Sequence, residues 1–304
     1  MINFQANVSG EYRIVTYKDD GSIDYDSGYF DNLITNYGLD SFGGSTVESL
    51  FPVCFLAPIT TPWTIANTAT AFPSGTTGSI QSTGTRTSTS DVKVASGYIE
   101  ASSEYRYGFN APVAATTYTH VGVGKDATHL GSVAPMSTPL TVSGGSAFDV
   151  FWKLTIKYPV SSKTTSATLG TTSHTCVLSP IGASNVSTAT HGWKVLDYPF
   201  KIDNSSKKCA GLVAMVPLIS PTDIFYTSAD AASIEPNSIT YSTYVAGSYN
   251  ILATLTWNTN GNDSFNVVHF RTCYGKFQVL FTPNFNKTAS DQLSITVRIS
   301  WARS

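Results

Sequence analysis

The chain has 304 residues, of which 12% are charged, about half of the ~25% that is usual in soluble domains. With 18 Lys and Arg against 20 Asp and Glu, the formal net charge is −2, which argues against a nucleic-acid partner held through a basic face. Hydrophobic residues make up 41% and aromatic residues 12%, so the chain can bury a core and wholesale disorder is not expected.

The N-terminal segment predicts a β-hairpin. Residues 1–7 lack the basic start and apolar stretch of a secretory signal, and no run in the chain approaches the ~18 apolar residues that span a bilayer. We therefore expect that the chain does not insert into a membrane and that it folds in a cytoplasm. The alternating segments Glu11–Lys18 and Ile23–Phe30 flank Asp19-Asp20-Gly21-Ser22, and an Asp-Gly step favours a tight hairpin turn.

One short helix is predicted near Thr35–Phe42. Thr35 is a suitable N-cap, and Tyr37, Leu39 and Phe42 form an apolar stripe before a pair of glycines. The hairpin and this helix together define a predicted N-terminal docking or assembly element at residues 1–45.

A long neutral segment follows the predicted strand Phe51–Leu56. Residues 57–90 are rich in Thr, Ser, Gly, Ala and Pro and almost without charge. We interpret them as a loop or extended arm lying on a neighbouring surface, since so long a loop is uncommon in a compact domain unless it has a role. Trp63 in this arm is a candidate anchor into a neighbouring subunit.

The rest of the chain predicts many short strands and few helices. The segment Ser161–Ser173 is a polar interruption, read as a linker or a projecting loop, and Asn260-Gly261 gives the strongest hairpin signal. The predicted fold is all-β, an antiparallel β-sandwich or jelly-roll-like architecture with long neutral loops. The body at 46–304 is either undivided or divided near 160–175. The strand candidates are Tyr98–Phe109, Tyr118–Val123, Leu140–Val142, Phe148–Tyr158, Thr175–Leu178, Trp193–Tyr198, Gly211–Val216, Ile239–Val245, Tyr249–Trp257, Phe265–Cys273, Lys276–Phe281 and Leu293–Trp301.

No residue pattern predicts a cofactor or metal site. The four cysteines are widely spaced and are expected to be buried and reduced, and the five histidines form no close pairs. A calcium loop would need alternating oxygen ligands and a distal Glu, so the acidic residues around Gly21 are read as a polar hairpin tip. These residues are Asp19, Asp20, Asp24 and Asp26.

No catalytic constellation is apparent either, and we expect a non-enzymatic protein. There is no nucleophile elbow. Glycan hydrolysis is the alternative, with Glu100, Glu104 and Asp197 as candidate carboxylates. A catalytic carboxylate pair is defined by its separation in space, which the sequence does not show.

Several stretches resemble tailed-bacteriophage virion structural proteins of the tail, baseplate or fibre-attachment type. The most specific is Ser9–Arg13, the turn at Asp20-Gly21-Ser22, and then Phe30–Asp40 with its Asn-Leu-Ile-Thr and Gly-Leu-Asp steps. Further matches are Tyr118–Gly124 with Leu130-Gly131-Ser132 and Phe148–Pro159, and the closing Ile299–Arg303. About half of the chain is touched, whereas residues 164–270 match nothing in that family.

The resemblance implies a structural subunit of a phage tail apparatus, located in the virion tail and assembled in the host bacterial cytoplasm. Its partners would be further copies of itself and other virion proteins. The alternatives are a capsid decoration protein, or a module that binds a receptor or host-surface glycan through the arm at 57–90 or the loop at 161–191. The candidate interface residues are Tyr12, Asn32, Leu33, Ile34, Tyr37, Leu39 and Trp63.

Overall fold

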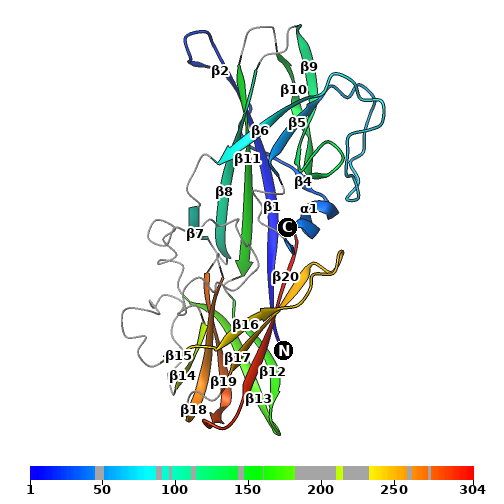
Figure 1. The fold of residues 1–304 in the computed structure, drawn as a ribbon. Helices are drawn as coiled ribbons and strands as arrows, with labels where there is room; N and C mark the ends of the chain where they lie inside the picture. The colour runs from blue at the N-terminus through cyan, green and yellow to red at the C-terminus, as the bar shows by residue number, and fades with distance from the viewer. Residues whose placement is uncertain are drawn as a thin grey trace. The chain divides into compact units, whose positions relative to one another are not determined.

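The described residues are mostly β-structure with one short helix, as predicted (Figure 1). The computed structural model describes residues 1–44, 51–86, 91–95, 98–110, 114–142, 147–159, 161–181, 210–214, 233–258, 262–272 and 275–304. The elements in chain order are β1 (Ile2–Tyr17), β2 (Ile23–Asp26), β3 (Phe30–Asp31), β4 (Leu33–Ile34), α1 (Asn36–Ser41), β5 (Val53–Ala57), β6 (Ile80–Arg86), β7 (Asp91–Ala95), β8 (Tyr98–Phe109), β9 (Thr116–Gly124), β10 (Leu130–Val142), β11 (Phe148–Pro159), β12 (Lys163–Leu169), β13 (Thr172–Ile181), β14 (Ala210–Ala214), β15 (Ser233–Ile234), β16 (Ser238–Tyr241), β17 (Asn250–Trp257), β18 (Asp263–Thr272), β19 (Gly275–Lys287) and β20 (Leu293–Arg303).

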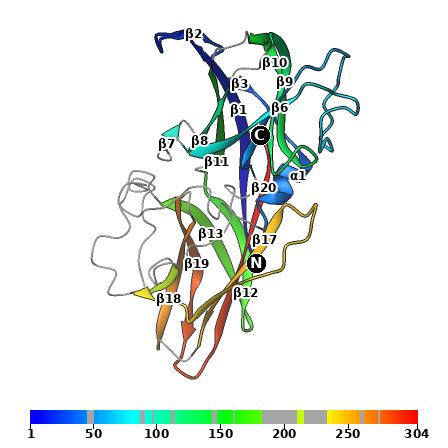
Figure 2. The same cartoon turned by 45° about the horizontal axis from the view of Figure 1, so that its top comes forward.

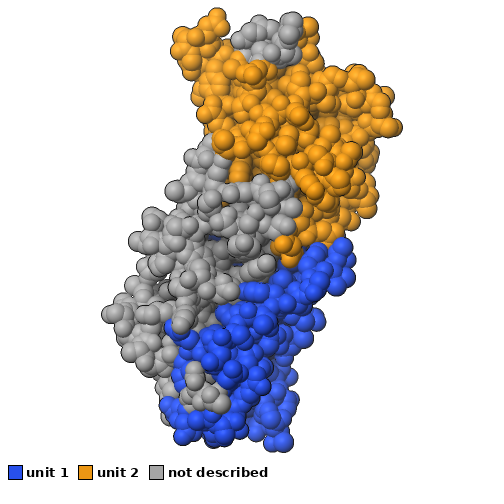
Figure 3. Space-filling view, viewed as in Figure 1, with its two compact units in different colours: residues 1–6, 91–101, 157–301 blue, residues 7–90, 102–156, 302–304 orange. Residues whose placement is uncertain are grey.

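Residue contacts divide the chain into two compact units (Figure 3). Unit 1 comprises residues 1–6, 91–101 and 157–301, and unit 2 comprises residues 7–90, 102–156 and 302–304. Residues 1–45 thus contribute to both units, and the prediction that they form a docking element stays a prediction.

Unit 2 is built around strands in the order β1-β11-β8-β6-β5-β9-β10-β4, and β2 and β3 also pair with β1. Alternate residues of β1 and β11 are buried, because side chains of a strand point to opposite faces, whereas β5 and β9 are buried at consecutive positions. The core contains large aromatic side chains, each of which contributes roughly 1.5–3 kcal/mol when fully buried. Among them are Tyr12, Tyr107, Tyr118, Phe148 and Trp152.

Unit 1 contains a sheet in the order β12-β13-β19-β18-β14-β15, together with β16, β17 and β20 and the start of β1. Its core is also aromatic. The ring centroid of Phe4 lies 4.6 Å from that of Tyr158 and 4.3 Å from that of Phe277, and Phe270 stacks on Phe277 at 5.5 Å.

The predicted helix and N-terminal hairpin are confirmed. Thr35 is the N-cap of α1 and accepts a hydrogen bond from the Gly38 amide at 3.0 Å. Strand β1 turns at residues 19–22 into β2, and Gly21 has a φ of 81°, which an L side chain rarely adopts. Strand β1 begins at Ile2, well before the predicted Glu11.

The neutral segment at 57–90 is not a loop throughout, because β6 occupies Ile80–Arg86 within it and pairs with β5 and β8. A Cβ at Gly84 would overlap the buried ring of Tyr107. The glycine therefore allows β6 and β8 to approach closely. In the sequence, the same glycine is part of a composition that is typical of loops.

Two further predictions about connections are wrong. The polar interruption at Ser161–Ser173 forms most of a hairpin, in which β12 pairs with β13 from Lys163↔Leu178 to Leu169↔Thr172. The predicted hairpin at Asn260-Gly261 would join β17 to β18, but β17 pairs with β16 and β20 whereas β18 pairs with β14 and β19. Within the described residues, β17 and β18 therefore belong to different sheets and do not pair with each other.

Some predictions lie outside the described residues. These concern the strand at Trp193–Tyr198, the Asn260-Gly261 step itself, Cys209 and Cys273. The other two cysteines, Cys54 and Cys176, are buried and free of disulfides, as predicted.

Candidate interaction surface

The outward face of β1, β11 and β8 in unit 2 carries a concentration of charged and aromatic side chains. These strands alternate, and their opposite face supplies buried residues such as Ile14, Trp152 and Tyr105. The outward positions of the three strands include Glu11, Arg13, Tyr17, Asp149, Phe151, Lys153, Glu104 and Arg106.

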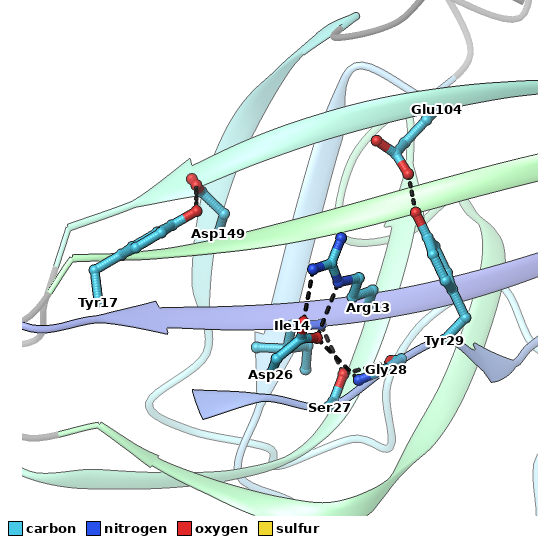
Figure 4. Close-up of polar contacts among 9 residues, drawn as sticks. All are labelled: Arg13, Ile14, Tyr17, Asp26, Ser27, Gly28, Tyr29, Glu104 and Asp149. Carbon is cyan, nitrogen blue, oxygen red and sulfur yellow. Dashed lines mark hydrogen bonds and ion pairs between the residues drawn. The ribbon is translucent and has the colours of Figure 1, made fainter. Parts of the chain in front are cut away.

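The chain returns from the hairpin turn and covers part of this face. Asp20 stabilises the turn by accepting hydrogen bonds from the amide and hydroxyl of Ser22, at 2.9 and 2.6 Å. After β2, the Ser27 amide donates to the Ile14 carbonyl at 2.9 Å. Gly28 then takes a φ of 63°, and this bend directs Tyr29 across the strands (Figure 4).

Arg13 holds the returning segment on β1. Its Nε and Nη2 donate to the two carboxylate oxygens of Asp26 at 2.9 and 2.6 Å, and its guanidinium lies 5.8 Å from the Tyr29 ring and 5.6 Å from the Phe151 ring. The hydrogen bonds from Arg13 and from the Gly28 amide lower the pKa of Asp26 to about 2. A bidentate pair of this kind also fixes orientation. We call Arg13, Asp26, Tyr29, Glu104 and Lys153 the Arg13 cluster.

Tyr29 connects the returning segment to the other two strands. Its hydroxyl donates to Glu104 on β8, and its ring lies 5.1 Å from the Lys153 ammonium on β11. Burial, and then the hydrogen bond to the Glu104 carboxylate, raise the pKa of Tyr29 to about 12. Tyr29 therefore remains a neutral donor at physiological pH, and 40% of its surface is exposed.

The remaining charges on this face are paired as well. Lys153 lies 3.0 Å from Glu11, and the buried carboxylate of Asp149 accepts from the Tyr17 hydroxyl at 2.6 Å and pairs with Arg106 at 2.8 Å. The partly exposed pair of Lys153 and Glu11 contributes little stability, whereas the buried Asp149 carboxylate depends on its partners. These pairs neutralise the face while leaving aromatic surface accessible.

The apolar side chains of the hairpin are exposed. Every residue of β2 is exposed, including Ile23 and Tyr25, which alternate with Asp24 and Asp26. The hairpin extends from the end of β1 in the ribbon view (Figure 1). Ile23, Tyr25 and Tyr29 are thus the exposed large apolar or aromatic side chains of the hairpin and the returning segment, and we call these three residues the hairpin surface.

The structure places most of the predicted interface residues inside unit 2. Tyr12, Ile34 and Leu39 are buried core residues, so their side chains pack within the fold and are not presented for contact. The Tyr12 hydroxyl donates to the Ser132 carbonyl at 3.2 Å. Leu33 is half-buried in β4, which pairs with β10.

Two other predicted interface residues also contact their own chain. With its amide oriented to satisfy both groups, Asn32 donates to the Gly10 carbonyl at 3.2 Å and accepts from Trp152 Nε1 at 3.1 Å. Tyr37 is half-buried, with its ring 5.2 Å from that of His129.

Trp63 is half-buried against the chain's own residues. Its ring lies 5.4 Å from that of His120 on β9 and 6.0 Å from that of Phe72. Trp63 thus attaches the segment at 58–79 to unit 2, although an exposed anchor was predicted.

Sequence reasoning did not identify the members of the Arg13 cluster as a group. Arg13 lies within a stretch that carries the family resemblance, and Arg13, Lys153 and Glu104 each occupy outward positions of alternating strands. That alternation was a usable signal for an outward face, but it does not say which three strands are neighbours.

Four of the acidic residues considered for metal binding or hydrolysis have partners within the chain. Asp20 and Asp26 bind Ser22 and Arg13, while Glu104 binds Tyr29 in unit 2 and Glu100 pairs with Lys157 in unit 1 at 3.3 Å. Asp197 lies outside the described residues. Within the described ranges, no three His, Cys, Asp or Glu side chains gather closely enough to hold a metal ion.

Comparisons with protein-family models, with curated proteins and with solved structures found no match for the chain. In the part of the chain that the structure describes, no helix has the length and apolar character to cross a membrane.

Proposed function

We propose that the chain is a structural subunit of a phage tail apparatus, that it acts through protein–protein contacts and that it is not an enzyme. The finer architecture proposed with it is an antiparallel β-sandwich, jelly-roll-like in its connections. Strands with one buried and one accessible face, such as β1 and β17, support that architecture because two inner faces that pack together form a sandwich core.

The observation that carries the proposal is the hairpin surface. Ile23 and Tyr25 are exposed on a short hairpin, and Arg13 fixes the returning segment so that Tyr29 is presented on a face whose charges are already paired. Interfaces favour aromatic residues and Arg and disfavour unpaired charge at their centre. A surface that is preorganised in this way loses little conformational freedom on binding.

The resemblance to virion proteins supports the tail setting. Its most specific part, which comprises Ser9–Arg13, Asp20-Gly21-Ser22 and Phe30–Asp40, supplies Arg13 and the hairpin turn and flanks the residues of the hairpin surface. Low charge over the whole chain suits a subunit with broad contacts to other proteins.

A double variant of the hairpin surface tests this proposal better than a deletion. Removing residues 1–45 would remove β1, which pairs with β20 and β11, and would damage the fold. The double substitution Ile23→Ser and Tyr25→Ser changes only exposed side chains. We expect the variant to fold normally, by circular dichroism and thermal unfolding. It should enter phage particles at least about tenfold less than wild type, the loss expected when the two substitutions together cost about 1.4 kcal/mol or more.

The matched control is Val245→Ser, which also removes an exposed apolar side chain, 66% accessible, but lies in unit 1. It should enter particles normally. Incorporation of the double variant at the wild-type level would contradict the proposed docking role. Binding of the purified chain to a glycan array, lost on Tyr29→Ala, would instead favour the receptor-binding alternative.

A further inference from the structure

Strand β12 forms an edge of the six-stranded sheet in unit 1. It pairs with β13 at seven consecutive positions without a register shift. The sheet order begins with β12, so within the described ranges no strand pairs with its other edge. Strands β12 and β13 lie side by side in both ribbon views (Figure 1 and Figure 2).

The turn determines which backbone groups of β12 point outward. Gly170, with a φ of 61°, and Thr171 form a two-residue turn between the paired residues Leu169 and Thr172. Residues that flank such a turn exchange hydrogen bonds with each other, and the next residue along each strand has its N–H and C=O directed away. The outward groups of β12 therefore belong to Thr164, Ser166 and Thr168, whose side chains are also exposed.

The sequence of β12 itself lacks the usual features that protect an edge strand against pairing. Edge strands are commonly guarded by charged residues, proline, a bulge or short length. Strand β12 has the sequence Lys-Thr-Thr-Ser-Ala-Thr-Leu, with its one charge at the first position and no proline. Three threonines favour the extended conformation. The edge is therefore a regular, neutral template for a further strand.

We propose that the free edge of β12 pairs antiparallel with β12 of a second copy of this chain, about a two-fold axis at Ser166. In this register Ser166 lies opposite its counterpart and Thr164 lies opposite Thr168. About six backbone hydrogen bonds then form between the outward groups of the two strands. Opposed hydroxyl side chains add favourable cross-strand contacts.

The strand complements itself in charge as well as in register. Lys163 falls opposite Leu169, and the two Lys163 residues lie about 20 Å apart along the paired strands at a rise of about 3.4 Å per residue. That separation exceeds the ~8 Å Debye length at physiological salt, so the two charges repel weakly. A two-fold axis makes the contact isologous, in which the same patch serves both copies.

This inference rests on the proposed function in one respect, because that function requires copies of the chain to join. The inference names the surface, the outer edge of β12, through which two copies join. A seven-residue edge is a small contact compared with stable interfaces, so we expect weak association that depends on concentration.

Sedimentation of the full chain over a concentration series tests the pairing. The wild-type chain should form dimers, and Ser166→Lys should weaken dimerisation at least about tenfold, because the two new charges would lie directly opposite each other. Ser173→Lys is the matched control, since it adds the same charge at an exposed position on β13 of the same hairpin and should leave dimerisation unchanged.

A cysteine variant provides a second test. Under oxidation, Ser166→Cys should give a covalent dimer, whereas Ser173→Cys should not. A wild-type chain that stays monomeric at the highest attainable concentration, or equal dimerisation of wild type and Ser166→Lys, would overturn the β12 pairing. Either result would leave the proposed function standing, provided that the hairpin double variant still fails to enter particles.

Discussion

Arg13 is the side chain on which the hairpin surface depends most. It binds both oxygens of Asp26 and lies within 6 Å of the centres of two aromatic rings. Cation–π contacts at exposed sites contribute about 0.5–1 kcal/mol each, so no single contact dominates. Their combined effect is to order the segment that carries Tyr29.

The pairing of Asp26 with Arg13 predicts a pH-dependent contribution to stability. The pKa of Asp26 is lowered from 3.8 to about 2 in the folded chain. The charged pair therefore stabilises the fold fully above pH 3.8 and loses this effect as the pH falls towards 2. Because Asp26 is about one-third exposed, we expect Asp26→Asn to cost only about 0.5–1 kcal/mol at pH 6.

Urea unfolding of wild type and Asp26→Asn between pH 2 and pH 6 measures this difference. The two unfolding free energies should converge as the pH falls through the range from 3.8 to about 2. Asp24→Asn, which removes the same charge from the same strand, is the control. A difference that persists unchanged at pH 2 would contradict the role of the ion pair.

Helix α1 depends on the cap at Thr35, which is buried and uses its hydroxyl twice. Thr35 Oγ1 accepts from the Gly38 amide at 3.0 Å and donates to the Leu130 carbonyl at 2.8 Å. Thr35→Ala would leave both groups without their partner, and we expect a loss of about 1–3 kcal/mol in the free energy of unfolding. Thr35→Ser keeps the hydroxyl and should recover most of the stability in denaturant titrations. Equal losses for the two variants would show that the methyl group matters and the cap does not.

Elements with strong apolar alternation could be predicted from the sequence. Strand β8 was predicted with its bounds, and the inward residues of β11 are buried as expected. Strands β6 and β12 could not be predicted, because they are held by backbone pairing and their side chains are small and polar. The strands next to them in the sheet provide the hydrogen-bonding partners, and the spacing of residues in the sequence does not show which strands are adjacent.

The predicted assembly element and the candidate surface share a segment but differ in the side chains named. The stretch 9–42 contains Arg13 and the hairpin, yet the residues selected within it, such as Tyr12 and Leu39, belong to the core. Apolar residues in a distinctive motif satisfy a core or an interface equally well. Only the inward or outward direction of each position separates the two, and that direction depends on the partner strands.

At the scale of the whole molecule, the chain has two compact units, with the hairpin surface in unit 2 and, among the described residues, the edge strand β12 in unit 1. Each of these two surfaces carries little net charge, in line with the formal net charge of −2 for the whole chain. A subunit with little net charge can assemble in many copies without strong mutual repulsion. The low charge of the chain is thus explained if much of its surface meets other protein.

The proposed function predicts that the chain is present in phage particles, and the most direct test is to locate it in purified particles. An antibody against the purified chain, coupled to gold and imaged by electron microscopy, should label the tail. The control is the same antibody after absorption with the purified chain, which should give no label. Labelling over the whole capsid, or particles without any label, would contradict the tail assignment.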